Sequence, residues 1–197
     1  MVISIDPGES ESGVAIMLNG VAAEEPQLVG FIEPNGTLVS KIKEYYVKYN
    51  PVVVVEDILP YRHQISKNVI STCKFIGELH YRLTSELSLD VRYFGRGKVK
   101  KWIFEAFPAL CCDRITKKIA YLDDYGEKNG KKRYRNKDGS IRKPSFHFVD
   151  DRVVIAAMKE LWNIPTPKPG RKNIYGFSAH SWQALALGSY FIENFSK

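Results

Sequence analysis

The sequence lacks several features that would assign it to a particular class of protein. No run of apolar residues approaches the ~18 that a membrane span needs, and the N-terminus has no basic-then-apolar secretory signal. Only three cysteines are present, an odd number with no Cys-x-x-Cys pair, so neither a disulfide framework nor a zinc knuckle is indicated. We therefore expect a soluble, cytoplasmic protein with reduced cysteines that does not bind a membrane.

The sequence also has no internal repeat and no linker long enough to divide it into two folding units. Its 197 residues, of which 44% are apolar, are enough for one ordinary domain with a sizeable core. We therefore expect a single domain over residues 1–197.

Basic residues are the most uneven feature that is present. The formal net charge is +7, and the segment 128–143 (KNGKKRYRNKDGSIRK) alone has eight basic residues and one acidic residue. This segment belongs to an irregular basic insertion that we place at about 109–146. The cations Lys131, Lys132, Arg133 and Arg135 surround Tyr134, which favours a loop that binds a polyanion such as DNA, although a solvated loop without a partner has the same composition.

The hydrophobic pattern predicts an α/β fold with a mixed five-stranded sheet, in which three antiparallel strands are followed by parallel strands and helices cover both faces. Strands are expected at 2–6, 13–18, 27–32, 51–57 and 90–94, with an Asn19–Gly20 hairpin turn. The run PVVVVED at 51–57 is typical of a central strand that is buried on both faces and parallel to a neighbour.

Helices are expected between and after these strands. Thr37 is the expected N-cap of the first helix, and Asp150 or Asp151 of the penultimate one. The remaining predicted helices lie at about 66–86, from 96 to 107 (RGKVKKWIFEAF), and at 178–195 (SAHSWQALALGSYFIENF).

Two of the predicted strands end in carboxylates, at Asp6 and Glu56. If these strands are neighbours in one sheet, both acids emerge at the same edge, where like charges repel unless a cation lies between them. Carboxylate oxygens suit Mg²⁺ or Mn²⁺. Taken singly, Asp6 could simply begin a turn and Glu56 could be the solvated end of a strand, but their joint placement favours a metal site.

Three stretches in the same order carry a resemblance to a known family. IDPGESESGVAI at the first two strands, VVVVED at the fourth and HSWQALALGSYF in the last helix resemble the RuvC-like Holliday junction resolvases of the ribonuclease H-like superfamily, and in particular a phage-type branch of them. The resemblance implies a ribonuclease H-like fold, a bacterial cytoplasm and a gene of bacterial or phage origin.

The resemblance also implies a catalytic site that binds two divalent metal ions. Its residues would be Asp6, Glu56 and, one helical turn apart on the last helix, His180 and Gln183, with Asp6, Glu56 and His180 as the metal ligands. Members of the family usually have two aspartates on that helix. Because Gln183 brings no charge, either it or another acid such as Asp151 completes the site.

This ligand set has consequences for the metal and for pH. With formal charge −2 from two carboxylates and a histidine that binds only when neutral, the site should bind Mg²⁺ weakly and prefer Mn²⁺. Activity should fall as the pH falls through roughly 6 to 7, where the histidine protonates.

The expected function is therefore divalent-metal-dependent cleavage of branched DNA, the resolution of Holliday junctions, by two-metal phosphodiester hydrolysis. Lys98, Lys100 and Lys101 could contact phosphates near the scissile bond or could form a solvated helix face. The family resemblance further implies a homodimer. Two alternatives stay open: another ribonuclease H-like nuclease that acts on flaps or RNA–DNA hybrids, and a DNA-binding structural protein with a decayed site.

Overall fold

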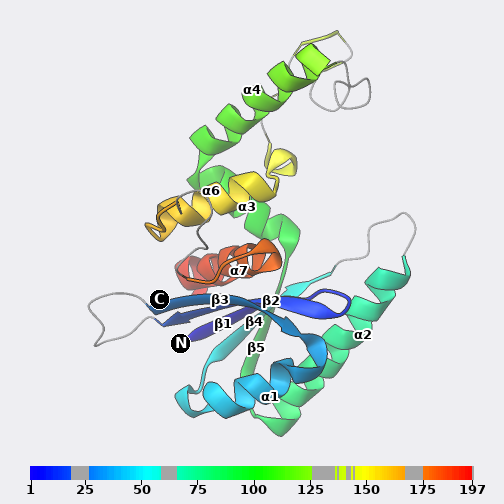
Figure 1. Ribbon diagram of the computed structural model, residues 1–197, viewed down its shortest axis with the longest axis vertical. Coiled ribbons are helices and arrows are strands. Elements are labelled where there is room, and N and C mark those ends of the chain that lie inside the picture. The colour runs from blue at the N-terminus through cyan, green and yellow to red at the C-terminus, as the bar shows by residue number, and fades with distance from the viewer. Residues whose placement is uncertain are drawn as a thin grey trace.

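The computed structural model describes residues 1–18, 27–58, 66–125, 136, 138–140, 143, 145–166 and 175–196. Its centre is a five-stranded sheet in the order β3-β2-β1-β4-β5 (Figure 1). The strands are β1 (Val2–Asp6), β2 (Glu11–Leu18), β3 (Gln27–Pro34), β4 (Val52–Asp57) and β5 (Asp90–Gly95). The first three pair antiparallel, β4 is parallel to β1, and β5 is parallel to β4, which confirms the predicted mixed sheet. The predicted Asn19–Gly20 turn lies outside the described residues.

Side chains point alternately to the two faces of each strand, and an apolar core covers each face of the sheet. Val53 and Val55 of β4 belong to one apolar core and Val54 to the other. The first core is closed by α1 (Asn35–Tyr45) and α2 (Lys67–Tyr81), which lie below the sheet in Figure 1.

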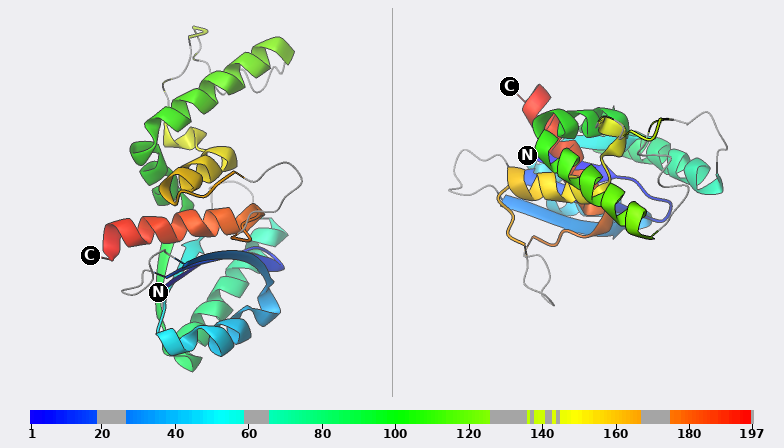
Figure 2. Two further views of the ribbon diagram at one scale, coloured as in Figure 1. Left: turned by 60° about the vertical axis from the view of Figure 1, so that its left-hand side comes forward. Right: turned by 90° about the horizontal axis from the view of Figure 1, so that it is seen from above.

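The other face is covered by α7 (Ala179–Phe195), which packs directly on β1 and β2. A further layer, α3 (Arg96–Ala106) and α6 (Asp151–Leu161), packs on the far side of α7 (Figures 1 and 2). Because it lies between two layers, α7 is apolar over most of its surface. The predicted helices on both faces are confirmed. No helix that the structure describes is both long and apolar enough to cross a membrane.

One part of the predicted irregular insertion is wrong. Residues Pro108–Tyr125 form the helix α4, which extends away from the sheet beyond α3 and α6 (Figure 1). Its apolar residues Cys111 and Ile115 are four residues apart, share one face and are buried, and Arg114 forms an ion pair with Asp150 at 3.0 Å. The basic composition of the region concealed this short helical pattern. Most of the segment 126–144 lies outside the described residues.

Of the two predicted helix caps, one is present in the structure and one is not. Thr37 does not cap the first helix, because α1 begins at Asn35 and the Thr37 hydroxyl donates instead to the Glu33 carboxylate at 2.8 Å. Asp150 does cap α6, since its carboxylate accepts from the backbone N–H groups of Arg152 and Val153 at 3.1 and 3.2 Å. The long second helix is α2, which begins after Ser66 and continues beyond Tyr81 as a π-helical turn, Arg82–Glu86. A short 3₁₀ turn, Val47–Tyr49, follows α1, and another is formed by Phe146–Phe148.

Candidate active site

Asp6 and Glu56 are brought together by the pairing of β1 with β4. These parallel strands place Ile5 opposite Val55, so the next residue of each strand, the acid, stands at the same edge of the sheet. Both acids are almost completely buried, with exposed fractions of 3% and 8%. The chain then leaves β1 through Pro7-Gly8, and a side chain at Gly8 would collide with the Glu11 carbonyl. The predicted meeting of the two acids is thus present in the structure.

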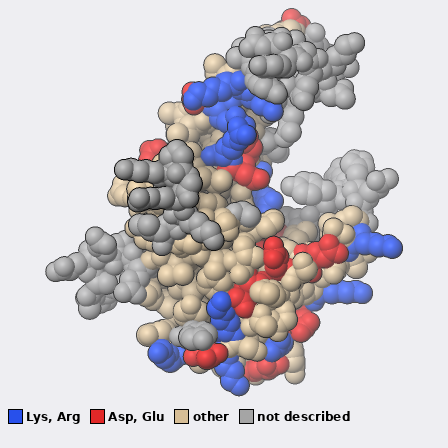
Figure 3. All heavy atoms as spheres, viewed as in Figure 1, with Lys and Arg blue, Asp and Glu red and all other residues tan. Residues whose placement is uncertain are grey.

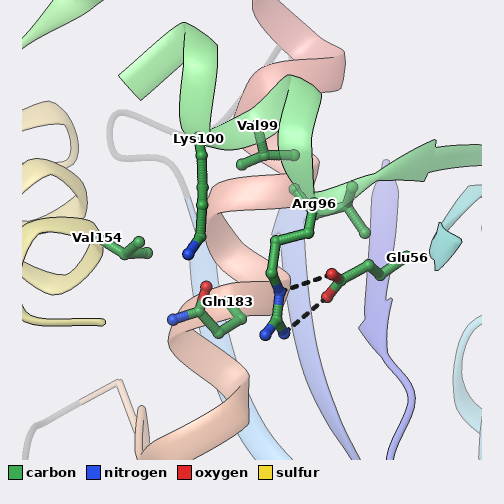
Figure 4. A pocket seen from close by; sticks show the side chains of 7 residues that line it. Glu56, Arg96, Val99, Lys100, Val154 and Gln183 are labelled. Carbon is green, nitrogen blue, oxygen red and sulfur yellow. Dashed lines mark hydrogen bonds and ion pairs between the residues drawn. The ribbon is translucent and has the colours of Figure 1, made fainter. Parts of the chain in front are cut away.

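Arg96, which the sequence reasoning did not select, bridges the two acids. Its guanidinium donates from Nε to Glu56 Oε1 at 2.7 Å and from Nη2 to Glu56 Oε2 at 3.0 Å, and Nη2 also lies 3.2 Å from Asp6 Oδ1. Figure 4 shows this fork-like contact between Arg96, at the start of α3, and Glu56. Arg96 directly follows β5, which is parallel to β4, so it emerges at the same edge of the sheet as the acids. That position is the sequence signal that could have identified it.

His180 approaches Asp6 from the first turn of α7. Its Nδ1 lies 2.9 Å from Asp6 Oδ2, and its side chain is 54% exposed. The start of α7 is fixed by a capping box, in which the side chains of Ser178 and Ser181 each bond to the backbone of the other. It is also fixed by close packing against Gly13, where a Cβ atom would collide with the backbone of His180. The predicted group of Asp6, Glu56 and His180 is therefore contiguous.

Gln183 lies one turn further along α7 and is oriented by Asp151. Its amide Nε2 donates to Asp151 Oδ1 at 3.0 Å, across the contact between α7 and α6. Gln183 also lines a small pocket whose other walls are Glu56, Arg96, Val99, Lys100, Val154 and Leu187 (Figure 4). The two residues between which the sequence could not choose, Gln183 and Asp151, are hydrogen-bonded to each other.

The buried acids influence each other's ionisation. Burial, followed by the neighbouring Asp6, raises the pKa of Glu56 to about 8 against the opposing effect of Arg96. Burial also acts to raise the pKa of Asp6, but the hydrogen bonds of His180 and Glu56 and the charge of Arg96 outweigh it and lower that pKa. The hydrogen bond to Asp6 raises the pKa of His180. Asp6 is thus the more acidic member of a pair in which like charges are held close together.

The three lysines predicted to bind DNA do not act as one group. Lys100 is half-buried and lines the pocket, pointing toward Gln183 in Figure 4, and burial lowers its pKa. Lys98 and Lys101 are exposed and turn elsewhere, with Lys98 Nζ 5.9 Å from the centre of the Phe94 ring and Lys101 Nζ 3.7 Å from Glu105. Only Lys100 is therefore adjacent to the acids. The other predicted cations, Lys131, Lys132, Arg133 and Arg135, lie outside the described residues.

Basic side chains are also present on the projecting helix. Figure 3 shows Lys and Arg gathered over α4, whose sequence includes Arg114, Lys117 and Lys118. Arg114 pairs with Asp150 and Lys117 with Asp113, the latter at 2.7 Å. Their charge is partly neutralised by these contacts.

The donor set suits a divalent cation, provided that Arg96 moves. Among the described residues, no group of three or more His, Cys, Asp or Glu side chains is arranged to hold a metal ion. Each of the four carboxylate oxygens of Asp6 and Glu56 has Arg96 or His180 as a partner in this structure. Two buried carboxylates and an imidazole are nevertheless suitable ligands for Mn²⁺ or Mg²⁺, and Arg96 shows that a positively charged group fits beside both acids.

Comparison with known proteins gives matches in structure only. No protein-family model matches the chain, and no curated protein matches its sequence. A structure of Thermus thermophilus RuvC superposes with a TM-score of 0.54 and 16% identity over 98% of this chain and 95% of that one. T. thermophilus RuvC in complex with a Holliday junction substrate superposes with a TM-score of 0.54 and 14% identity over 99% and 96%. The chain therefore has a RuvC-like fold of the ribonuclease H-like type over nearly its whole length.

Proposed function

We propose that this protein is a divalent-metal-dependent endonuclease that cleaves branched DNA, with Asp6, Glu56 and His180 as its metal ligands. The observation that carries the proposal is the convergence of these three side chains, from β1, β4 and α7, at one edge of a RuvC-like sheet. The similar fold of T. thermophilus RuvC, which is known in complex with a Holliday junction, supports a four-way junction as the substrate.

The chemistry follows from the types of residue. Two Mg²⁺ or Mn²⁺ ions bound there would activate a water molecule and stabilise the charge on the departing oxygen of a phosphodiester. The residues of this chain hold and orient the reactants: Asp6 and Glu56 supply negative charge, and His180, whose side chain is half exposed, supplies a neutral nitrogen at the open side of the site. Gln183 supplies an amide oxygen. Lys100 supplies a cation close to the acids that can contact the phosphate of the cleaved strand.

A cleavage assay tests this proposal directly. Wild type and Asp6→Asn are incubated with a synthetic four-way junction, a flap and an RNA–DNA hybrid, each with Mn²⁺ and with Mg²⁺. We expect cleavage of the junction by the wild type and loss of at least about 100-fold in Asp6→Asn, because the substitution removes a carboxylate that would hold the metal. Asp57→Asn is the matched control, since Asp57 is the next residue of β4 and strand alternation places it on the opposite face from Glu56.

Cleavage of the flap or the hybrid in preference to the junction would assign another ribonuclease H-like nuclease. Undiminished cleavage by Asp6→Asn would refute the proposed site.

One alternative has specific support. Gln183 carries no charge and Arg96 occupies the acids, as expected of a DNA-binding structural protein with a decayed site. That alternative predicts junction binding that weakens with salt, no cleavage with any divalent metal, and no change in melting temperature on addition of Mn²⁺. The nuclease predicts Mn²⁺-dependent stabilisation that Asp6→Asn abolishes.

A homodimer is proposed because resolution of a junction requires two cuts, and the exposed side of α2 suits a second copy of the chain. Ile70, Cys73, Gly77 and Tyr81 follow one face of this helix at spacings of three to four residues, and Ile70 and Tyr81 are 46% and 63% exposed. A Cβ atom at Gly77 would meet nothing within 4 Å in the chain itself, so the chain does not need glycine there. A glycine in mid-helix costs ~1 kcal/mol relative to alanine, and close approach of a partner helix would account for it.

Light scattering tests the dimer. The wild type should have the mass of two chains, and Tyr81→Glu should have the mass of one. Tyr49→Glu, at a 56% exposed tyrosine after α1, should stay dimeric. A monomeric wild type at the concentrations that cleave the junction would contradict the dimer.

A further inference from the structure

We propose that Arg96 is an internal cation of this site: it holds Asp6 and Glu56 in place when no metal is bound, and it must leave them before a divalent metal binds. Arg96 is then a positioning residue that sets the metal affinity. The inference rests on the proposed function, because it takes Asp6 and Glu56 to be metal ligands.

The guanidinium of Arg96 occupies oxygen atoms of both acids. Arg96 engages both oxygens of Glu56, at 2.7 and 3.0 Å, and one oxygen of Asp6, at 3.2 Å, while His180 engages the other oxygen of Asp6 at 2.9 Å. A guanidinium is always charged and matches a carboxylate with two parallel hydrogen bonds. A metal ion that binds these carboxylates from the same side therefore competes with Arg96 for the same oxygens.

The burial of the acids explains why such a cation is needed. Asp6 and Glu56 are 3% and 8% exposed, and two adjacent buried acids cannot both be ionised without a counter-charge except at a cost to the stability of the fold. In the described part of the chain, Arg96 is the cation whose hydrogen bonds reach both of them. The metal-free protein thus keeps its ligands ordered at the cost of a contact that metal binding must break.

Arg96 also has room to move. Its side chain is 43% exposed, it stands at the first position of α3 after Gly95, and a Cβ atom at Gly97 would meet nothing within 4 Å. Asp151 of α6 lies close enough for its charge to act on Arg96, and among the described residues its carboxylate accepts one side-chain hydrogen bond, from Gln183. A displaced guanidinium therefore has a second carboxylate within electrostatic reach.

The consequence is a metal affinity that rises when the arginine is removed. Charge-assisted hydrogen bonds of this kind contribute enough to stability that losing the competitor should tighten Mn²⁺ binding by about tenfold or more. A purely structural role predicts the reverse, because an arginine that only supports the site would weaken metal binding when it is lost.

The experiment measures metal binding and not cleavage. Calorimetric titration with Mn²⁺ and melting temperatures with Mn²⁺ or with a chelator are compared for wild type, Arg96→Gln and Arg92→Gln. Arg92 is the matched control, because it also pairs with a carboxylate, Asp90 at 2.8 Å, but at an exposed position of β5. We expect Arg96→Gln to melt lower than wild type with chelator, to bind Mn²⁺ at least about tenfold more tightly, and to be stabilised more by it; Arg92→Gln should bind as wild type.

The outcomes separate the inference from the proposed function. Equal or weaker Mn²⁺ binding by folded Arg96→Gln, with wild-type binding that Asp6→Asn abolishes, overturns the role of Arg96 and leaves the metal site standing. Absence of Mn²⁺ binding in wild type and in every variant overturns both. If Arg96→Gln does not fold, Arg96→Lys decides: it keeps the charge but cannot form the double contact, so it should fold and bind Mn²⁺ more tightly than wild type. Binding equal to or weaker than wild type would overturn the inference.

Discussion

Gly13 links the two halves of the site, and its replacement by alanine is the most specific structural test of the arrangement. Gly13 pairs with Asp6 across β1 and β2, and it also packs against the start of α7. A methyl group at this position would lie 2.5 Å from the His180 carbonyl oxygen and 2.6 Å from the Ser181 nitrogen. These are backbone atoms of a helix, so no side-chain rotation can relieve the collision.

The expected effects of Gly13→Ala on stability and on cleavage rate follow from these distances. Contacts of a Cβ atom below 3.0 Å essentially do not occur, so the first turn of α7 must retreat from the sheet by about half an ångström or more. Overpacking of this kind costs about 1–3 kcal/mol of unfolding free energy. The same displacement carries His180 away from Asp6, and misplacement of a catalytic group by about 1 Å can lower a rate about 100-fold.

The assay combines urea denaturation with junction cleavage and Mn²⁺ binding, at a temperature where both proteins are fully folded. Gly36→Ala is the control, because a Cβ atom there would meet nothing within 4 Å and the position is in the first turn of α1, a different helix. We expect Gly13→Ala to lose stability, Mn²⁺ affinity and at least about tenfold in cleavage rate, and Gly36→Ala to lose none of these. Wild-type stability together with wild-type cleavage in Gly13→Ala would refute the packing of α7 against β2 as the support of His180.

Two further predictions concern ionisation. His180→Asp should shift the preferred ion from Mn²⁺ toward Mg²⁺ and flatten the pH profile, because the Asp6 hydrogen bond raises the pKa of His180 and its proton competes with metal as the pH falls through that raised pKa. An unchanged profile would exclude His180 as a ligand. Glu33 accepts from Lys41 at 2.6 Å and from Thr37, which together lower its pKa below 4.5 in spite of burial. Since a lowered carboxyl pKa stabilises the fold above the unfolded pKa, Glu33→Gln should cost about 1 kcal/mol of unfolding free energy at pH 7 in urea denaturation. This cost should shrink as the pH falls below 4.5 and disappear below the lowered pKa of Glu33; a difference independent of pH would contradict the assignment.

The sheet could be predicted from sequence because its signals are local. The runs at 2–6 and 51–57 each contain four or more consecutive buried residues, whose side chains point to both faces of the sheet. Such a continuous run indicates a central strand without any knowledge of distant contacts. The meeting of Asp6 and Glu56 then needed one inference, that β1 and β4 are parallel neighbours, and the register confirms it. The position of His180 came from a family resemblance, not from the chain's own pattern.

The errors share a physical cause. Thr37 was expected to cap α1 because its hydroxyl is a good acceptor, but the nearby Glu33 carboxylate takes that hydroxyl as a donor. The helix α4 was predicted to be irregular because charged residues are frequent in it, and in the part whose side chains are described, residues 108–118, the buried ones are Cys111 and Ile115. In both places the structure depends on which groups a side chain contacts, and composition alone does not reveal these contacts.

Arg96 was missed for a related reason. Its partners are 40 and 90 residues earlier in the chain, and its own neighbours, Lys98, Lys100 and Lys101, made the segment look like a solvated basic helix face. The error was to treat charge as a property of the segment. The four cations point in different directions, and only Arg96 and Lys100 face the acids.

Gln183 and Arg96 are parts of the same charge balance. A carboxylate in place of Gln183 would add a further negative charge beside Glu56 and the pocket, and one guanidinium would not neutralise it. In this chain the additional negative charge is on Asp151 of α6, whose carboxylate accepts a hydrogen bond from the Gln183 amide at 3.0 Å. Because the attraction between charges falls with distance, Asp151 contributes less to a cation held by Asp6 and Glu56 than a ligand on α7 would. Because the amide of Gln183 is neutral, a single arginine can balance the buried acids in the absence of metal. For the same reason, the site should bind a divalent metal only slightly more tightly than it holds Arg96.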